Sequence, residues 1–126
     1  QISGARRLVE ETGAELMLPE LADISYEATR IKGGDEIRMG GVGLRVFHAP
    51  GHRPEQINLL VIDYPRGEEP WAMLTADFVM VGDVARPDLA QGGESGADQL
   101  FNDSIPRFLD LPDHVEVYPG HLAGST

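Results

Sequence analysis

The sequence has 126 residues and contains no cysteine. This absence excludes a disulfide framework, a thiolate zinc site and a cysteine nucleophile within the chain. It is also typical of proteins from a reducing compartment, so we expect a cytoplasmic protein.

Long apolar runs and an excess of positive charge are also missing. No window approaches the roughly 20 apolar residues of a membrane span, so we expect a soluble protein without a membrane partner. Asp and Glu number 21 against 10 Lys and Arg, which gives a net charge of −11. Without a basic stripe, that charge argues against nucleic acid as a partner and is typical of a well-solvated surface.

The pattern of apolar residues and turns predicts a single α/β unit over residues 1–126, without repeats or linkers. Helices are predicted at 3–12 and 97–109, and strands at 16–18, 35–39, 42–47, 57–62, 71–75 and 115–118. Residues 21–29 are expected to form a loop or a fragment of helix, and Gly40-Gly41 a hairpin turn. Pro106 is expected to kink the second helix or to begin a new turn. Gln1 is not an initiator methionine, so we expect a piece of a longer protein.

Residues 74–89 read L-T-A-D-F-V-M-V-G-D-V-A-R-P-D-L and organise the rest of the chain. An apolar run ends abruptly at Asp77, and a second apolar run follows directly. A carboxylate at the end of a buried strand needs a cation, a proton or several hydrogen-bond donors. Asp77 is therefore predicted to have such a partner.

Two Pro-Gly-His motifs, ending in His52 and His121, also follow predicted strands. If successive strands alternate in direction, His52 and Asp77 emerge at the same edge of the sheet, and His121 joins them if its strand runs in the same sense. A single His in a turn is more often a surface residue, but this combination favours a metal site. Imidazole nitrogen and carboxylate oxygen suit zinc, iron or manganese.

Other polar residues have less specific interpretations. His48 is predicted to support the site or to lie in the core, and His114 to lie in a solvated loop. Three charged residues follow Asp77 closely: Asp83, Arg86 and Asp88. Either Arg86 is held between the two carboxylates and fixes the loop, or the cluster orients metal ligands or binds an anionic substrate.

Four segments together resemble the metallo-β-lactamase superfamily, and most closely its persulfide dioxygenase branch, including members fused to rhodanese domains. The segments are I-S-G-A-R-R-L, H-A-P-G-H-R-P-E, L-T-A-D-F-V-M-V-G-D-V-A-R-P-D-L and L-P-D-H-V-E-V-Y-P-G-H-L-A-G-S. They keep the family's order over nearly the whole chain. The G-D-V-x-R-P-D-L run is the most specific of these signals.

The resemblance implies part of an αββα sandwich, with a mixed, mostly antiparallel sheet and flanking helices. It also implies a mononuclear Fe(II) site that uses His52 and Asp77. The third ligand of such enzymes comes from an H-x-H-x-D-H motif, which with the N-terminal strands would lie upstream of Gln1. His121 matches a second-metal ligand of glyoxalase II relatives, and in the dioxygenases it stays near the site without binding iron.

The implied reaction is the oxidation of a small-molecule persulfide, such as glutathione persulfide, to sulfite by O₂. The alternatives are a binuclear zinc thioester hydrolase of the glyoxalase II type and a truncated, non-catalytic domain. This 126-residue chain alone is expected to be inactive, whereas the intact protein is expected to be an enzyme. A homo-oligomer and a fused rhodanese domain are both compatible with the sequence.

Some residues depart from the family pattern. Ala76, Ala85 and Leu122 stand where glycine is usual, and Arg53 stands where threonine is common. Methyl groups at the glycine positions would shift the ligand loops if those positions have positive φ. Arg53 would favour an anionic substrate, or would point to solvent.

Overall fold

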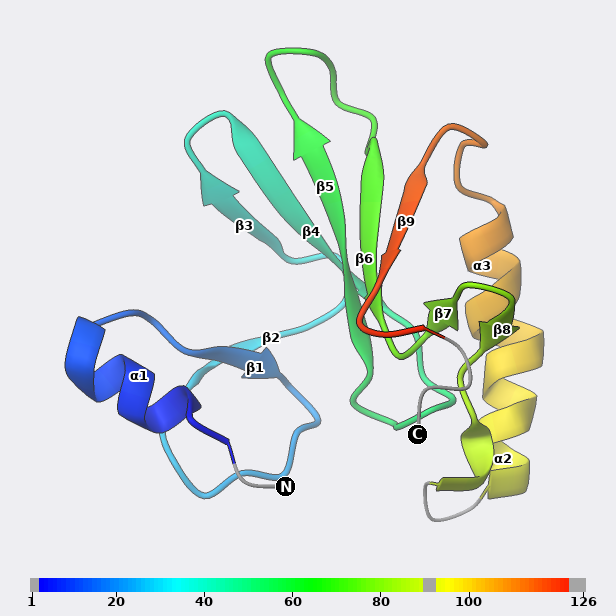
Figure 1. Ribbon diagram of the computed structural model, residues 1–126, viewed down its shortest axis with the longest axis horizontal. Helices are drawn as coiled ribbons and strands as arrows, with labels where there is room; N and C mark the ends of the chain where they lie inside the picture. Colours follow the sequence, from blue (N-terminus) through cyan, green and yellow to red (C-terminus); the bar gives the residue numbers. More distant parts are fainter. Residues whose placement is uncertain (1–2, 90–92, 123–126) are drawn as a thin grey trace.

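The computed structural model describes residues 3–89 and 93–122. Its main feature is a five-stranded sheet in the order β3-β4-β5-β6-β9 (Figure 1). Neighbouring strands are antiparallel except β6 and β9, which are parallel. The strands are β3 (Glu36–Met39), β4 (Val42–His48), β5 (Ile57–Asp63), β6 (Ala72–Ala76) and β9 (Glu116–Pro119). The predicted α/β class with a mixed, mostly antiparallel sheet is confirmed.

The predicted hairpin of β3 and β4 is confirmed in its register and its turn. Met39 pairs with Val42 across Gly40 and Gly41. Gly40 has a φ of 62°, which glycine adopts without the steric cost that a side chain would add. This turn sets which face of β4 is buried.

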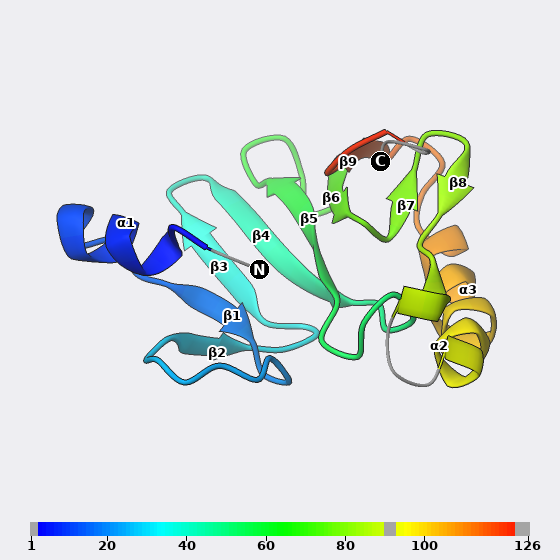
Figure 2. The same ribbon diagram turned by 60° about the horizontal axis from the view of Figure 1, so that its bottom comes forward.

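A helical segment covers one face of the sheet on its β9 side (Figures 1 and 2). It consists of α2 (Gly93–Gln99), a π-helical turn (Leu100–Ser104) and α3 (Ile105–Leu109). The structure divides the predicted helix into three pieces, and Pro106 lies in the first turn of α3, as one of the two sequence alternatives predicts. Proline has no amide hydrogen to donate, and the irregular hydrogen bonding of the preceding π-helical turn accommodates it.

The core lies between this helical segment and the sheet. Phe78 is fully buried and packs edge-on against Phe108, with ring centroids 5.8 Å apart. The buried cluster around it comprises Ala49, Leu60, Met73, Phe78, Ala85 and Leu100. Because Phe78 directly follows Asp77, burial of its ring anchors the loop that carries the carboxylate.

The opposite face of the sheet is partly open to solvent. A hollow of about 390 Å³ there is lined by Ile57, Asn58, Leu59, Leu74, Ala76, Tyr118, Pro119 and Gly120. Leu74 is 41% exposed and Tyr118 is 45% exposed. The described residues thus form one main sheet with one layer of helices.

The smaller elements are helix α1 and two short strand pairs. Helix α1 (Ala5–Thr12) ends at Gly13, which has a φ of 70°, as the sequence predicts, but none of its residues is buried. Strand β1 (Met17–Pro19) pairs in parallel with β2 (Thr29–Ile31), which the sequence does not predict. A second unpredicted pair is β7 (Val79–Met80) with β8 (Asp83–Val84). None of the helices in the described residues is long and apolar enough to span a membrane.

Candidate metal centre

Three strands of the main sheet end at the same edge and run in the same direction. β4 and β6 are each antiparallel to β5, and β9 is parallel to β6. The loops that follow them therefore meet at one edge, at the bottom of Figure 1. His52 follows β4 and Asp77 follows β6, as the alternation of strands predicts. His121 follows β9, whose direction the sequence leaves open and the structure shows to be the same.

The side chains of these three residues converge on Asp77. His52 Nε2 lies 3.4 Å from Asp77 Oδ2, and His121 Nε2 lies 3.2 Å from Asp77 Oδ1. The side chains of His52, Asp77 and His121 are 15%, 45% and 43% exposed, respectively. The group is thus open on one side.

The other ring nitrogen of each histidine faces a main-chain carbonyl. His52 Nδ1 lies 3.0 Å from the Arg86 oxygen, and His121 Nδ1 lies 2.9 Å from the Leu122 oxygen. A carbonyl oxygen only accepts hydrogen bonds, so each Nδ1 carries the hydrogen and donates it. In the neutral rings, each Nε2 then presents a lone pair to a carboxylate oxygen of Asp77.

A lone pair facing a carboxylate is unfavourable unless a cation or a proton lies between them. A metal ion with nitrogen and oxygen ligands at 2.0–2.2 Å and tetrahedral angles places such atoms about 3.4 Å apart. Both observed separations are close to that value. The donor atoms at each His–Asp77 pair therefore fit a metal ion.

The three residues do not form a complete site by themselves. Within residues 3–89 and 93–122, no group of three or more His, Asp or Glu side chains is placed to hold one ion. Each histidine faces a different oxygen of Asp77. The arrangement consists of two nitrogen–oxygen pairs that share one carboxylate.

The turn before His52 packs tightly against the helical segment. Gly51 is buried and has a φ of 143°. A β-carbon on Gly51 would lie 2.7 Å from Leu100 Cβ, which is too close for any side chain. The Pro-Gly pair thus fixes the direction in which the chain enters His52.

The loops that carry Asp77 and His121 are joined to each other. Ala76 has a φ of 45° and is the one non-glycine residue with positive φ in the described part of the chain. Its carbonyl accepts a hydrogen bond of 2.8 Å from the Gly120 amide. Because glycine is usual at position 76 in the family that the sequence resembles, this φ explains that preference physically.

Comparisons with known proteins agree with this geometry. No family model matches the chain. A metallo-β-lactamase from Staphylococcus aureus superposes with a TM-score of 0.86 and 36% identity, over 98% of this chain and 39% of that one. The chain has a metallo-β-lactamase fold. ETHE1 from Myxococcus xanthus superposes with a TM-score of 0.73 and 28% identity, over 100% of this chain and 51% of that one.

Two curated relatives of this metallo-β-lactamase-fold chain are 31% and 25% identical to it. An uncharacterised protein of Mycobacterium tuberculosis is 31% identical over 93 residues, which are 74% of this chain and 40% of that protein. A hydroxyacylglutathione hydrolase of Idiomarina loihiensis is 25% identical over 122 residues, which are 94% and 41% of the two chains. The chain spans about 40% of the length of these relatives.

The structure agrees only in part with the two interpretations of the charged residues Asp83, Arg86 and Asp88. Arg86 pairs with Asp88 through a 2.7 Å contact, whereas Asp83 accepts a hydrogen bond from the amide of its neighbour Val84. The hydrogen bond from Arg86 lowers the pKa of Asp88, and the same bond raises the pKa of Arg86. Arg86 is thus not held between two carboxylates, and it reaches His52 through its main-chain oxygen.

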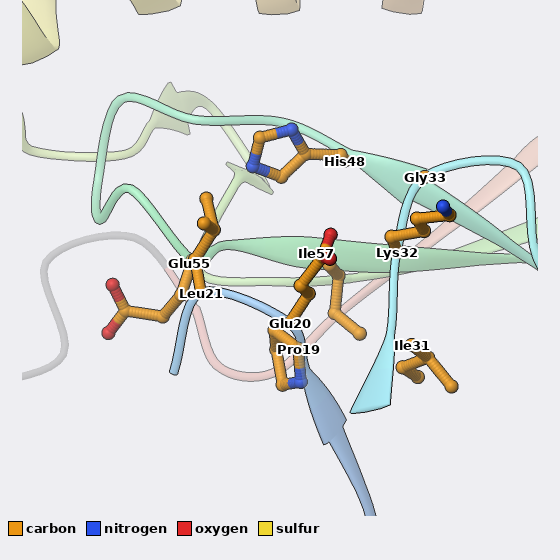
Figure 3. A pocket seen from close by; sticks show the side chains of 9 residues that line it. All are labelled: Pro19, Glu20, Leu21, Ile31, Lys32, Gly33, His48, Glu55 and Ile57. Carbon is orange, nitrogen blue, oxygen red and sulfur yellow. The ribbon is translucent and has the colours of Figure 1, made fainter. Parts of the chain in front are cut away.

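The other two histidines, His48 and His114, do not belong to the group around Asp77. His48 Nε2 lies 2.8 Å from the Pro54 oxygen, and its ring lines a small pocket of about 50 Å³ (Figure 3). Residues from the ends of β1 and β2 form the opposite wall of that pocket. His114 is exposed in the loop before β9, as predicted.

Proposed function

We propose that this chain is part of a non-heme Fe(II) persulfide dioxygenase, and that the intact protein is longer than these 126 residues. The observation that carries the proposal is the distance of 3.4 Å between His52 Nε2 and Asp77 Oδ2, which is the spacing of a nitrogen and an oxygen ligand on one metal ion. The G-D-V-x-R-P-D-L motif and the likeness to ETHE1 support the dioxygenase branch.

His52 and Asp77 would hold the iron, and further histidines would come from an H-x-H-x-D-H motif outside this chain. When bound, the iron supplies the redox chemistry between the persulfide sulfur and O₂. The hydrogen bond from His52 Nδ1 to the Arg86 oxygen keeps Nε2 unprotonated and turned to the metal. His121 would stay beside the site and would not bind the iron.

The overall reaction balances without another oxidant. One persulfide, one O₂ and one water give one thiol, one sulfite and two protons. The terminal sulfur loses four electrons, and O₂ takes up the same four. The protein's own contribution is to position the persulfide and the metal ligands and to keep other reactants away.

Arg53 would attract an anionic persulfide such as glutathione persulfide. It directly follows His52 in the turn and is exposed. No ion pair of its side chain is found among the described residues, and the chain as a whole carries a net charge of −11. An unneutralised guanidinium beside the site would bind the substrate's carboxylates.

Oxygen uptake by the iron-loaded intact protein with glutathione persulfide, together with sulfite formation, tests the proposal. His52→Ala and Asp77→Ala should abolish both, whereas His114→Ala, in the exposed loop, should retain them. Iron-loaded intact protein that forms no sulfite would refute the dioxygenase assignment.

A second candidate function is that of a binuclear zinc thioester hydrolase. The observation in its favour is that each histidine faces a different oxygen of Asp77, as a carboxylate bridging two ions would require. The similarity to hydroxyacylglutathione hydrolases points the same way. Thioester hydrolysis by zinc-loaded intact protein that takes up no O₂ would favour this candidate.

A third candidate is a domain that keeps the fold without the chemistry. It accords with the lack of a complete group of metal ligands in the described residues. It predicts weak metal binding even by the intact protein. Stoichiometric iron retained through gel filtration would exclude it.

A further inference from the structure

We propose that Ser104, in the π-helical turn, is a positioning residue for His52. This inference rests on the proposed role of His52 as a metal ligand. Ser104 is fully buried, and its hydroxyl donates a 2.7 Å hydrogen bond to the Pro50 oxygen, two residues before His52.

The direction of this hydrogen bond is unusual for a helical serine. Such hydroxyls commonly bond to a carbonyl one turn earlier in their own helix. The Ser104 hydroxyl instead reaches a residue 54 positions away, in the turn that leads to His52. It therefore ties two segments together and does not serve its own helix.

Two neighbours on the same helical face strengthen this connection. Leu100 packs where a β-carbon of Gly51 would be, and the Arg107 guanidinium donates a 2.8 Å hydrogen bond to the His48 oxygen. Positions 100, 104 and 107 are spaced by four and three, so they lie along one side of the segment. The helical segment thus holds the main chain from His48 to Gly51, directly before His52.

A π-helical turn is rare and is often found at functional sites. Here it spans Leu100–Ser104, with the Ile105 amide bonded to the Leu100 oxygen. Its first and last residues are the two that are buried, and both face the His52 turn. The irregular hydrogen bonding of the helical segment therefore lies where the segment contacts the turn that leads to His52.

His52 is then fixed in two ways. Ser104 fixes the main chain that leads into it, and the Arg86 oxygen fixes the ring at Nδ1. Without the hydrogen bond from Ser104, the turn can shift, and the His52 ring then loses its hydrogen bond to the Arg86 oxygen. The Nε2 atom would then leave its position opposite Asp77.

The test is long-range ¹H–¹⁵N NMR of the histidine rings in the metal-free intact protein, which reads the tautomer of His52 directly. The wild type should show the Nδ1–H form. In Ser104→Ala, the ratio of Nδ1–H to Nε2–H should fall by about fivefold or more, the change that corresponds to the loss of one hydrogen bond. Ser95→Ala, at an exposed serine of α2, is the matched control and should leave the ratio unchanged.

A folded Ser104→Ala protein with an unchanged His52 tautomer would overturn the proposal. If Ser104→Ala does not fold, Arg107→Gln replaces it, because Arg107 is partly exposed and bonds to the same turn. A shift in the same direction supports the proposal, and no shift overturns it. Ser104→Thr, which keeps the hydroxyl, should restore the wild-type ratio.

This readout does not depend on activity. A tautomer shift in Ser104→Ala, combined with an intact protein that oxidises no persulfide, would keep the positioning role and refute the proposed function. An active enzyme in which Ser104→Ala leaves the His52 tautomer unchanged would support the proposed function and refute the positioning role of Ser104.

Discussion

The amide of Gly120 donates a 2.8 Å hydrogen bond to the carbonyl of Ala76. The residues that follow, His121 and Asp77, are thereby held beside each other at the ends of two parallel strands. A β-carbon on Gly120 would lie 3.3 Å from the Ala76 backbone, so the two loops are in close contact. The left-handed conformation of Ala76 is part of this junction.

Ala76→Gly should stabilise the protein. At a φ of 45°, alanine has a steric cost that glycine avoids, and part of the gain is offset by the greater freedom of glycine in the unfolded chain. We expect a gain of about 0.5–1 kcal/mol in the free energy of unfolding, measured by urea denaturation. Ala85→Gly is the control, because Ala85 is buried and lacks positive φ, and it should cost about 1–2 kcal/mol.

Asp77→Asn should stabilise the metal-free protein slightly. The amide nitrogen can donate to one of the Nε2 atoms, which removes one pair of facing acceptors and adds about 1 kcal/mol in the presence of a chelator. Metal that binds the folded state should raise the melting temperature of the wild type and not that of the variant. Equal stabilisation of both proteins by metal would contradict the assignment of Asp77 as a ligand.

Phe78→Leu should destabilise the fold and loosen the Asp77 loop. It removes the edge-on contact with Phe108 and leaves a partial cavity, so we expect a loss of about 1–2 kcal/mol by thermal or chemical unfolding. Phe101→Leu is the matched control, because Phe101 is 76% exposed, and it should stay within about 0.5 kcal/mol of the wild type.

The stability that Glu36 contributes should depend on pH. The hydrogen bond from the Tyr64 hydroxyl, followed by contacts with Arg45 and Arg38, lowers the pKa of Glu36 in the folded protein. A lowered folded pKa means that this stability is fully present above the unfolded pKa of about 4.3 and is lost as the pH falls through the folded value.

Tyr64→Phe tests this dependence, since it removes the hydroxyl and keeps the ring beneath Arg38. Its deficit in unfolding free energy should be constant from neutral pH down to about pH 5 and should shrink below that. A deficit that grows on acidification would show that the hydrogen bond favours the protonated carboxyl.

The strands that position the site could be predicted from the sequence because they are long and have clear boundaries. The Gly40-Gly41 turn predicts the antiparallel pair β3–β4, and alternating directions assumed for β4, β5 and β6 are confirmed by their antiparallel pairing. Those directions place His52 and Asp77 at one edge. The position of His121 depends on the direction of β9, which the sequence leaves open, and the structure shows that β9 is parallel to β6.

Other features could not be predicted, for physical reasons. Strands β7 and β8 have two residues each and exist because of tertiary hydrogen bonds, such as that from Ala85 to the Phe78 oxygen. The contact of Arg86 with His52 uses a main-chain carbonyl, which every residue has. Ser104 gives no signal either, because a serine on a helix is usually exposed.

Metal analysis of the intact protein tests the central claim most directly. The account predicts about one iron per chain, lost in His52→Ala and Asp77→Ala and retained in His121→Ala. Two zinc ions per chain, one of which is lost in His121→Ala, would contradict it and favour the binuclear hydrolase.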